Sequence, residues 1–233
     1  MIYLFGCSHT RIPYLNYIKD NIRNIAFKDC STMGNSNQKI IWDVYQVLNS
    51  KKFDKENDIL VIQYTYTNRW WRPNILPHQS SSFHSFSNQS PIYRNNKPFD
   101  DELLKFYSTF IKFFWDSEIS FTQHLMDIEF LKTYLDVNKI KYIHYCWTDN
   151  GNPQEWNQDS IDIENKQISH SLLENLNCEH FENNYLIGHW VREKGWTQDD
   201  DHIKPIHYKD YFHKILDKIY LKFDSKIIEK KLV

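Results

Sequence analysis

The sequence predicts an α/β fold in which helices cover both faces of a parallel sheet. Apolar runs of strand length recur along the chain, and segments with helical spacing of apolar residues separate them. Strands that alternate with helices in this way form parallel sheets, because each crossover brings the chain back to the same edge. The clearest strand is the continuous apolar run at 58–66, which is typical of a strand buried on both faces.

The other elements follow from the same two patterns. We expect about five strands, at 2–6, 24–28, 58–66, 141–147 and 183–188. We expect helices over 11–22, 37–50, 100–115, 118–137, 166–177 and from about 206 to 223. The segment 67–100 shows neither the helical nor the strand spacing of apolar residues, and 148–165 is a polar loop. We therefore predict one domain over 1–233, with 67–100 as an insertion after the third strand rather than a domain boundary.

Composition excludes several classes of partner. The chain has 28 basic and 30 acidic residues, for a net charge of −2, and it lacks the basic face of a nucleic-acid-binding protein. No apolar run approaches the roughly 18 to 20 residues of a membrane span. A strand begins at residue 2 in place of a signal peptide, so we expect a cytoplasmic protein without nucleic-acid or membrane partners. The four cysteines show no CxxC spacing, and we expect reduced thiols.

Ser8 stands where the first strand turns into the first helix. The stretch IYLFGCSHT, at 2–10, begins as an apolar strand, stops at Gly6 and continues with small or polar residues. In an α/β sheet this is the edge at which ligands bind. A serine hydroxyl is a useful nucleophile only when a base takes its proton and donors hold the developing oxyanion.

A candidate histidine base and a candidate carboxylate lie near the other end of the chain. His202 follows Asp199 by three residues in the stretch DDDHIKP, just before the last predicted helix. Asp199 could reach Nδ1 of His202 and orient the ring. Two alternatives remain: the three aspartates are a solvated run that caps the helix, or Asp199, His202 and His207 bind a metal. The metal alternative lacks the i, i+4 histidine spacing of the common zinc helix.

Oxyanion donors are expected at the ends of the second and third strands. Gly34 lies in a polar loop, where a glycine lets the backbone N–H approach a ligand closely, although an ordinary turn would also use one. Asn35, Ser36 and Asn37 follow as candidate caps for the next helix. Asn68 and Arg69 stand at the end of the third strand, and the amide of Asn68 could donate a further hydrogen bond.

Taken together, these blocks resemble the SGNH-hydrolase (GDSL) family. The first block of that family is Gly-Asp-Ser-x-Thr, which residues 6–10 match except that Cys7 replaces the aspartate. Residues 34–37 resemble its second block, and 199–202 with Pro205 match its closing Asp-x-x-His. The chain departs from the third block, Gly-x-Asn-Asp: Tyr64 or Thr65 stands near the glycine position, and either a displaced Asn68 or Thr65 takes the place of the asparagine.

The resemblance implies a flavodoxin-like, three-layer α/β/α fold and an esterase mechanism without a metal or cofactor. Ser8 would be the nucleophile, His202 the base and Asp199 its orienting acid. The N–H groups of Ser8 and Gly34, with a side chain such as Asn68, would hold the oxyanion. The substrate would be a small O-acyl ester, such as an acetyl ester, of a carbohydrate or similar molecule. Alternatives are an O-acyltransferase acting on a glycan and a catalytically weak glycan-binding module.

The predicted insertion would supply the substrate contacts. It is rich in aromatic and basic residues, including Arg69, Trp70 and Trp71, and has no period that would bury them. Long loops of this kind are often lids or binding loops. We predict that Trp70 stacks on a sugar ring and that Arg69 binds a polar or anionic group. The alternative is that the two tryptophans seal the core beneath the loop.

Overall fold

The computed structural model contains a parallel sheet of four strands with helices on both faces. It describes residues 1–22, 25–33, 35–65, 93–94, 97–98, 117–147, 170–182, 184–198 and 202–223. The strands lie in the order β2 (Phe27–Asp29), β1 (Ile2–Phe5), β3 (Ile59–Tyr64) and β6 (Lys141–Cys146), and every neighbouring pair is parallel. The α/β class predicted from the alternating pattern is therefore confirmed.

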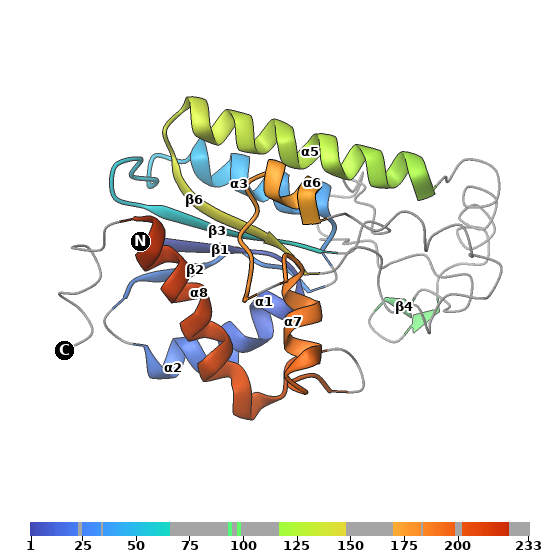
Figure 1. Ribbon diagram of the computed structural model, residues 1–233. Coiled ribbons are helices and arrows are strands. Elements are labelled where there is room, and N and C mark those ends of the chain that lie inside the picture. Colours follow the sequence, from blue (N-terminus) through green and yellow to red (C-terminus); the bar gives the residue numbers. More distant parts are fainter. Residues whose placement is uncertain are drawn as a thin grey trace.

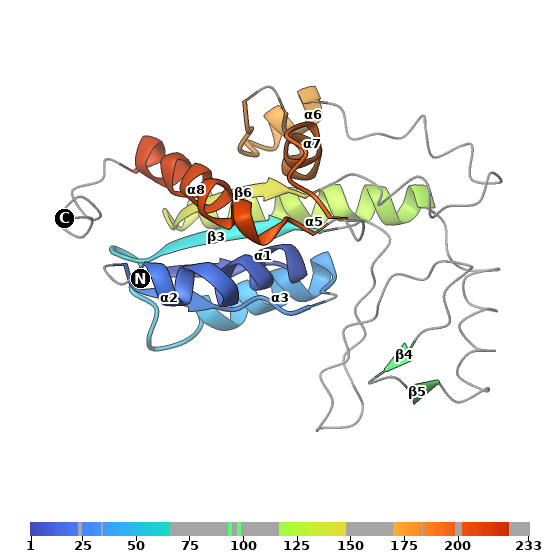
Figure 2. The ribbon, with the colours of Figure 1, turned by 90° about the horizontal axis from the view of Figure 1, so that it is seen from below.

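Helices form one layer on each side of this sheet. Figure 1 shows α3, α5 and α6 on one face and α1, α2, α7 and α8 on the other, and Figure 2 looks onto the second face. Their bounds are α1 (Ser8–Pro13), η1 (Tyr14–Ile18), α2 (Lys19–Asn21), α3 (Asn37–Leu48), α5 (Ser117–Val137), α6 (His170–Asn175), α7 (Ile187–Glu193), η4 (Pro205–His207) and α8 (Tyr208–Lys222). The arrangement is the three-layer α/β/α sandwich that the resemblance implied.

The alternation of side chains along the strands divides the core in two. Successive residues of a strand point to opposite faces. Tyr3 and Phe5 accordingly pack with residues of α3, α5 and α6, whereas Ile2 and Leu4 pack with residues of α7 and α8. All residues of β1 and β3 are buried, which explains why both were predicted as continuous apolar runs.

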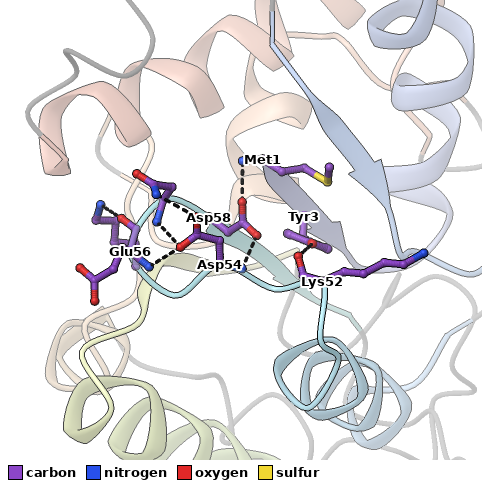
Figure 3. A network of polar contacts seen from close by, with 8 residues as sticks. Met1, Tyr3, Lys52, Asp54, Glu56 and Asp58 are labelled. Carbon is purple, nitrogen blue, oxygen red and sulfur yellow. Dashed lines mark hydrogen bonds and ion pairs between the residues drawn. The ribbon is translucent and has the colours of Figure 1, made fainter.

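A polar network fixes the relative positions of β1 and β3 at the amino edge of the sheet (Figure 3). The terminal ammonium of Met1 donates to Oδ1 of Asp58 at 2.6 Å, and the N–H of Asp54 donates to the other oxygen of Asp58 at 2.8 Å. The hydroxyl of Tyr3 reaches the carbonyl of Lys52 at 3.5 Å. With the strand starts held here, the carboxyl ends of β1 and β3 meet at the opposite edge.

The prediction of a fifth strand at 183–188 is wrong. Within this segment Leu186 makes a single parallel bridge with Cys146, and α7 begins at the next residue. The N–H of Gly188 donates to the carbonyl of Trp147 at 2.7 Å, so the chain turns into a helix where a strand would have continued along β6. About five strands were predicted for the parallel sheet, and in the described part of the chain this sheet has four.

Other boundaries shift by a few residues. The helix expected over 11–22 begins at Ser8, and the strand expected at 24–28 occupies 27–29. Within the predicted insertion, β4 (Tyr93–Arg94) and β5 (Lys97–Pro98) form a short antiparallel pair. The rest of that insertion and the helix expected over 100–115 lie outside the described residues. Among the described helices, none has the length and apolar character needed to cross a membrane.

Candidate active site at the carboxyl edge of the sheet

The turn from β1 into α1 requires a glycine. A Cβ built on Gly6 would lie 2.1 Å from Oγ1 of Thr10 and 3.2 Å from Cβ of Gln63. Thr10 cannot move away freely, because its hydroxyl donates to Oε1 of Gln63 at 2.8 Å. Tyr211, from α8, donates to the same oxygen at 3.2 Å. The start of α1 is thus anchored to both β3 and α8.

Ser8 is the first residue of α1 and follows the last residue of β1, Phe5, by three positions. Cys7 precedes it in an extended conformation and makes no side-chain cap. The N–H groups of a first helical turn have no partner within the helix, so the N–H of Ser8 is available to a bound group. Ser8 is 7% exposed, so it is buried at the carboxyl edge of the sheet and does not lie on an open surface.

His202 lies on a tight loop that returns to this edge. Thr197 and Ile203 form an antiparallel bridge, and the N–H of Gln198 donates to the carbonyl of His202 at 2.7 Å. The ring of His202 stacks on the ring of His9, with a centroid distance of 4.6 Å and an interplanar angle of 25°. His202, from the far end of the chain, therefore contacts the residue that directly follows Ser8.

The remaining predicted residues fall mostly outside the described part of the chain. Asp199, Gly34, Asn68, Arg69 and Trp70 all belong to this group, so their roles stay predictions. Described residues close in sequence to two of these positions, Thr65 after β3 and Asn35 after β2, are held by hydrogen bonds.

Asn37 fixes the end of β3. Its side-chain oxygen accepts the N–H of Thr65 at 2.7 Å, and its side-chain amide donates to the carbonyl of Thr65 at 3.2 Å. Thr65 is fully buried. Ser36, the residue before, caps α3 by accepting the N–H of Lys39 at 3.3 Å. The sequence identified both as cap candidates, but only Ser36 caps, whereas Asn37 holds the strand that leads toward Asn68.

A second set of contacts holds the loop after β2 against α1. Arg11 donates to Oδ2 of Asp29 at 3.2 Å and to the carbonyl of Ser31 at 2.9 Å. Asp29 also accepts the N–H of Ser31 at 2.9 Å. Farther along, the amide of Asn35 donates to the carbonyl of Gly6 at 3.2 Å. Sequence reasoning missed the contacts of Arg11, Asp29 and Ser31, which belong to no motif, whereas Asn35 and Gly6 lie in the second and first blocks.

Trp147 is the most prominent site residue that the motifs do not contain. It follows β6 directly, and its ring stacks on His9 with a centroid distance of 3.8 Å and an interplanar angle of 13°. A Cβ on Gly188 would lie 2.5 Å from the Trp147 carbonyl oxygen and 3.2 Å from its indole ring. A large aromatic residue at the last position of the predicted strand 141–147, at the edge that carries Ser8, was the available signal.

The described residues offer no metal site, and three of their four thiols are buried. They contain no group of three His, Cys, Asp or Glu side chains arranged to hold a metal ion. His207 stacks on Trp196, with a centroid distance of 5.0 Å. All four cysteines are free thiols, and a hydrogen bond with Cys146 lowers the pKa of Cys178. Both of these thiols are buried in the core, which argues against a role as nucleophile.

Comparisons with known proteins give limited information. No family model matches the sequence, and no curated protein matches it. Among solved structures, the chain is similar to TesA, with 9% sequence identity, a TM-score of 0.48, and coverage of 94% of this chain and 97% of that one. A similarity at this level carries no argument about function.

Proposed function

We propose that the chain is a serine esterase that removes a small acyl group, such as acetyl, from a carbohydrate or similar polar substrate. The observation that supports the proposal is the contact between His202 and His9, the residue that directly follows Ser8 at the carboxyl edge of the sheet. The sequence match to the first and last blocks of the SGNH hydrolases supports the same pairing.

In the proposed reaction, Oγ of Ser8 attacks the carbonyl carbon of the ester. His202 takes the hydroxyl proton and then gives it to the departing alcohol oxygen, which leaves an acyl-serine. Water attacks this intermediate, His202 takes a proton from the water, and the acid leaves as Ser8 recovers its proton. Asp199 holds the ring of His202 and stabilises the imidazolium.

The developing oxyanion would lie over the start of α1. The N–H of Ser8 has the helix dipole behind it, which favours negative charge at this end. The N–H of Gly34 and the side chain of Asn68, or of Thr65 in its place, would complete the set of donors. The hydrogen bonds from Asn35 to Gly6 and between Asn37 and Thr65 would help to hold these donors in place.

The central test is modification and mutation of Ser8. A serine-directed organophosphonate should add mass at Ser8 of the native protein. Ser8→Ala should reduce hydrolysis of p-nitrophenyl acetate by roughly 10³-fold or more without changing the melting temperature. Wild-type turnover in this variant would exclude the proposed nucleophile. Product analysis with a sugar acceptor separates hydrolysis from acyl transfer.

The acid is tested by three neighbouring substitutions. Asp199→Asn should slow turnover strongly, because the histidine loses the partner that sets its tautomer and orientation. Asp200→Asn and Asp201→Asn are matched controls on the same loop and should have much smaller effects. If Asp201 were the sensitive position, the assignment of the closing block would be wrong.

Substrate size tests the contacts that we assign to the insertion. Trp70→Ala and Arg69→Ala should weaken turnover of a large acylated glycan much more than turnover of p-nitrophenyl acetate, since these contacts are remote from the bond that breaks. Equal losses on both substrates, together with a large drop in melting temperature, would instead show that Trp70 packs in the core.

A further inference from the structure

The ring of His9 lies between two other rings. Trp147 is nearly parallel to it at 3.8 Å, and His202 is stacked on it at 4.6 Å. Two rings that both lie this close and nearly parallel to a third would overlap if they shared one of its faces. Trp147 and His202 therefore lie on opposite faces of His9, which is itself only 2% exposed.

Each ring of this stack comes from a separately anchored segment. His9 is on α1, whose start is tied to β3 through Thr10. Trp147 follows β6, and its carbonyl accepts the N–H of Gly188, a residue that leaves room for the indole. The backbone of His202 is held by Gln198. The outer indole cannot shift easily, so the His9 ring is a fixed surface for His202.

A general base needs this kind of restraint. The final torsion of a histidine side chain is broad, so the ring can turn about its last bond at little cost. A base is efficient only when its ring nitrogen points at the proton that it takes. A flat surface against one face of the ring allows the orientation parallel to that surface and disfavours the others.

We propose that His9 is a positioning residue that fixes the plane of the His202 ring; this inference rests on the function proposed above. His9 occupies the variable position of the first sequence block, so the motif assigns it no role. What matters in this role is a flat ring backed by Trp147, and not the acid–base chemistry of an imidazole. A filler of the core would need only the right volume.

The test compares two substitutions of similar volume. His9→Phe keeps a flat ring, whereas His9→Leu fills the space without one, and His9→Met is a second non-aromatic variant in case His9→Leu fails to fold. We expect His9→Leu to lower kcat for p-nitrophenyl acetate by about 10- to 100-fold with an unchanged KM, because misplacement of a reacting group has costs of this order. His9→Phe should recover most of that loss. His213→Leu, at an exposed position of α8, is the control for removing a histidine.

A second measurement does not depend on turnover. Ring currents from a stacked aromatic ring shift the carbon-bound protons of His202 upfield in the NMR spectrum. We expect these resonances to move downfield in His9→Leu and to stay near their wild-type positions in His9→Phe.

The outcomes separate this inference from the proposed function. Wild-type kcat in His9→Leu, or an equal loss of kcat in His9→Phe and His9→Leu, would overturn the positioning role. Resonances of His202 that are the same in all three proteins would show that the stack itself is wrong. Turnover that survives in Ser8→Ala would refute the serine mechanism while leaving the NMR result on the stack intact.

Discussion

Replacing Asn37 with alanine tests how the end of β3 is held beside the candidate site. The substitution removes both hydrogen bonds to Thr65, of 2.7 and 3.2 Å, and leaves a backbone N–H and a carbonyl without these partners. Asn37 is 3% exposed and Thr65 is 0% exposed, so water cannot readily replace the amide. An unsatisfied buried polar group costs about 1–3 kcal/mol, and two such groups should lower the free energy of unfolding by about 3 kcal/mol.

Ser36→Ala is the matched control for Asn37→Ala. It removes the cap at the adjacent position, where the side chain accepts the N–H of Lys39, and should cost about 1 kcal/mol. Urea denaturation followed by circular dichroism gives the free energy of unfolding for both variants and the wild type. The reasoning is refuted if Asn37→Ala lowers the free energy of unfolding by no more than Ser36→Ala does. The two hydrogen bonds to Thr65 would then contribute no more than an ordinary helix cap.

Three further predictions concern pH, packing and metal. Burial lowers the pKa of His124 from 6.5 to about 4, so between these pH values the unfolded chain binds a proton that the folded chain does not. The free energy of unfolding should therefore fall by about 3 kcal/mol between about pH 6.5 and pH 4. Urea titrations should show that His124→Leu loses this pH dependence. Leu131→Ala is the control, and it should be destabilised by the same amount at pH 6.5 and at pH 4. Gly6→Ala should lower the melting temperature and the turnover together, because its Cβ would collide with the hydroxyl of Thr10; unchanged values would contradict the close approach. Turnover should survive EDTA, and full inhibition that zinc reverses would instead favour the metal alternative.

The strands that were predicted correctly are those whose burial is visible in their composition. The runs at 58–66 and 141–147 are apolar on both faces because helices cover both sides of the sheet. The segment 183–188 has a shorter apolar run, Tyr185 to Ile187, and its structure depends on the bond from Gly188 to the carbonyl of Trp147, a residue distant in the sequence. A short apolar run does not distinguish a strand from the start of a helix, so this segment was assigned wrongly.

The candidate site shows the same division between local and tertiary signals. Ser8 became a candidate because strand, glycine and polar turn follow one another in the sequence, and His202 because an aspartate precedes it at a suitable spacing. The stack of Trp147, His9 and His202 joins three segments that are far apart in the chain. Nothing in the sequence around any one of these rings indicates which other ring it meets.

The order of the strands in the sheet has a consequence for how the chain is made. β2, β1, β3 and α3 all lie within the first 65 residues, so this part can assemble early during synthesis. β6 pairs with β3 only after a much longer stretch has been added, since Ile59 is aligned with Lys141. Pairings of such high contact order form slowly, and until β6 arrives one edge of β3 has no neighbouring strand. Refolding from denaturant should therefore be slow and prone to aggregation at high concentration, whereas synthesis on the ribosome gives the early unit time to form before its last strand appears.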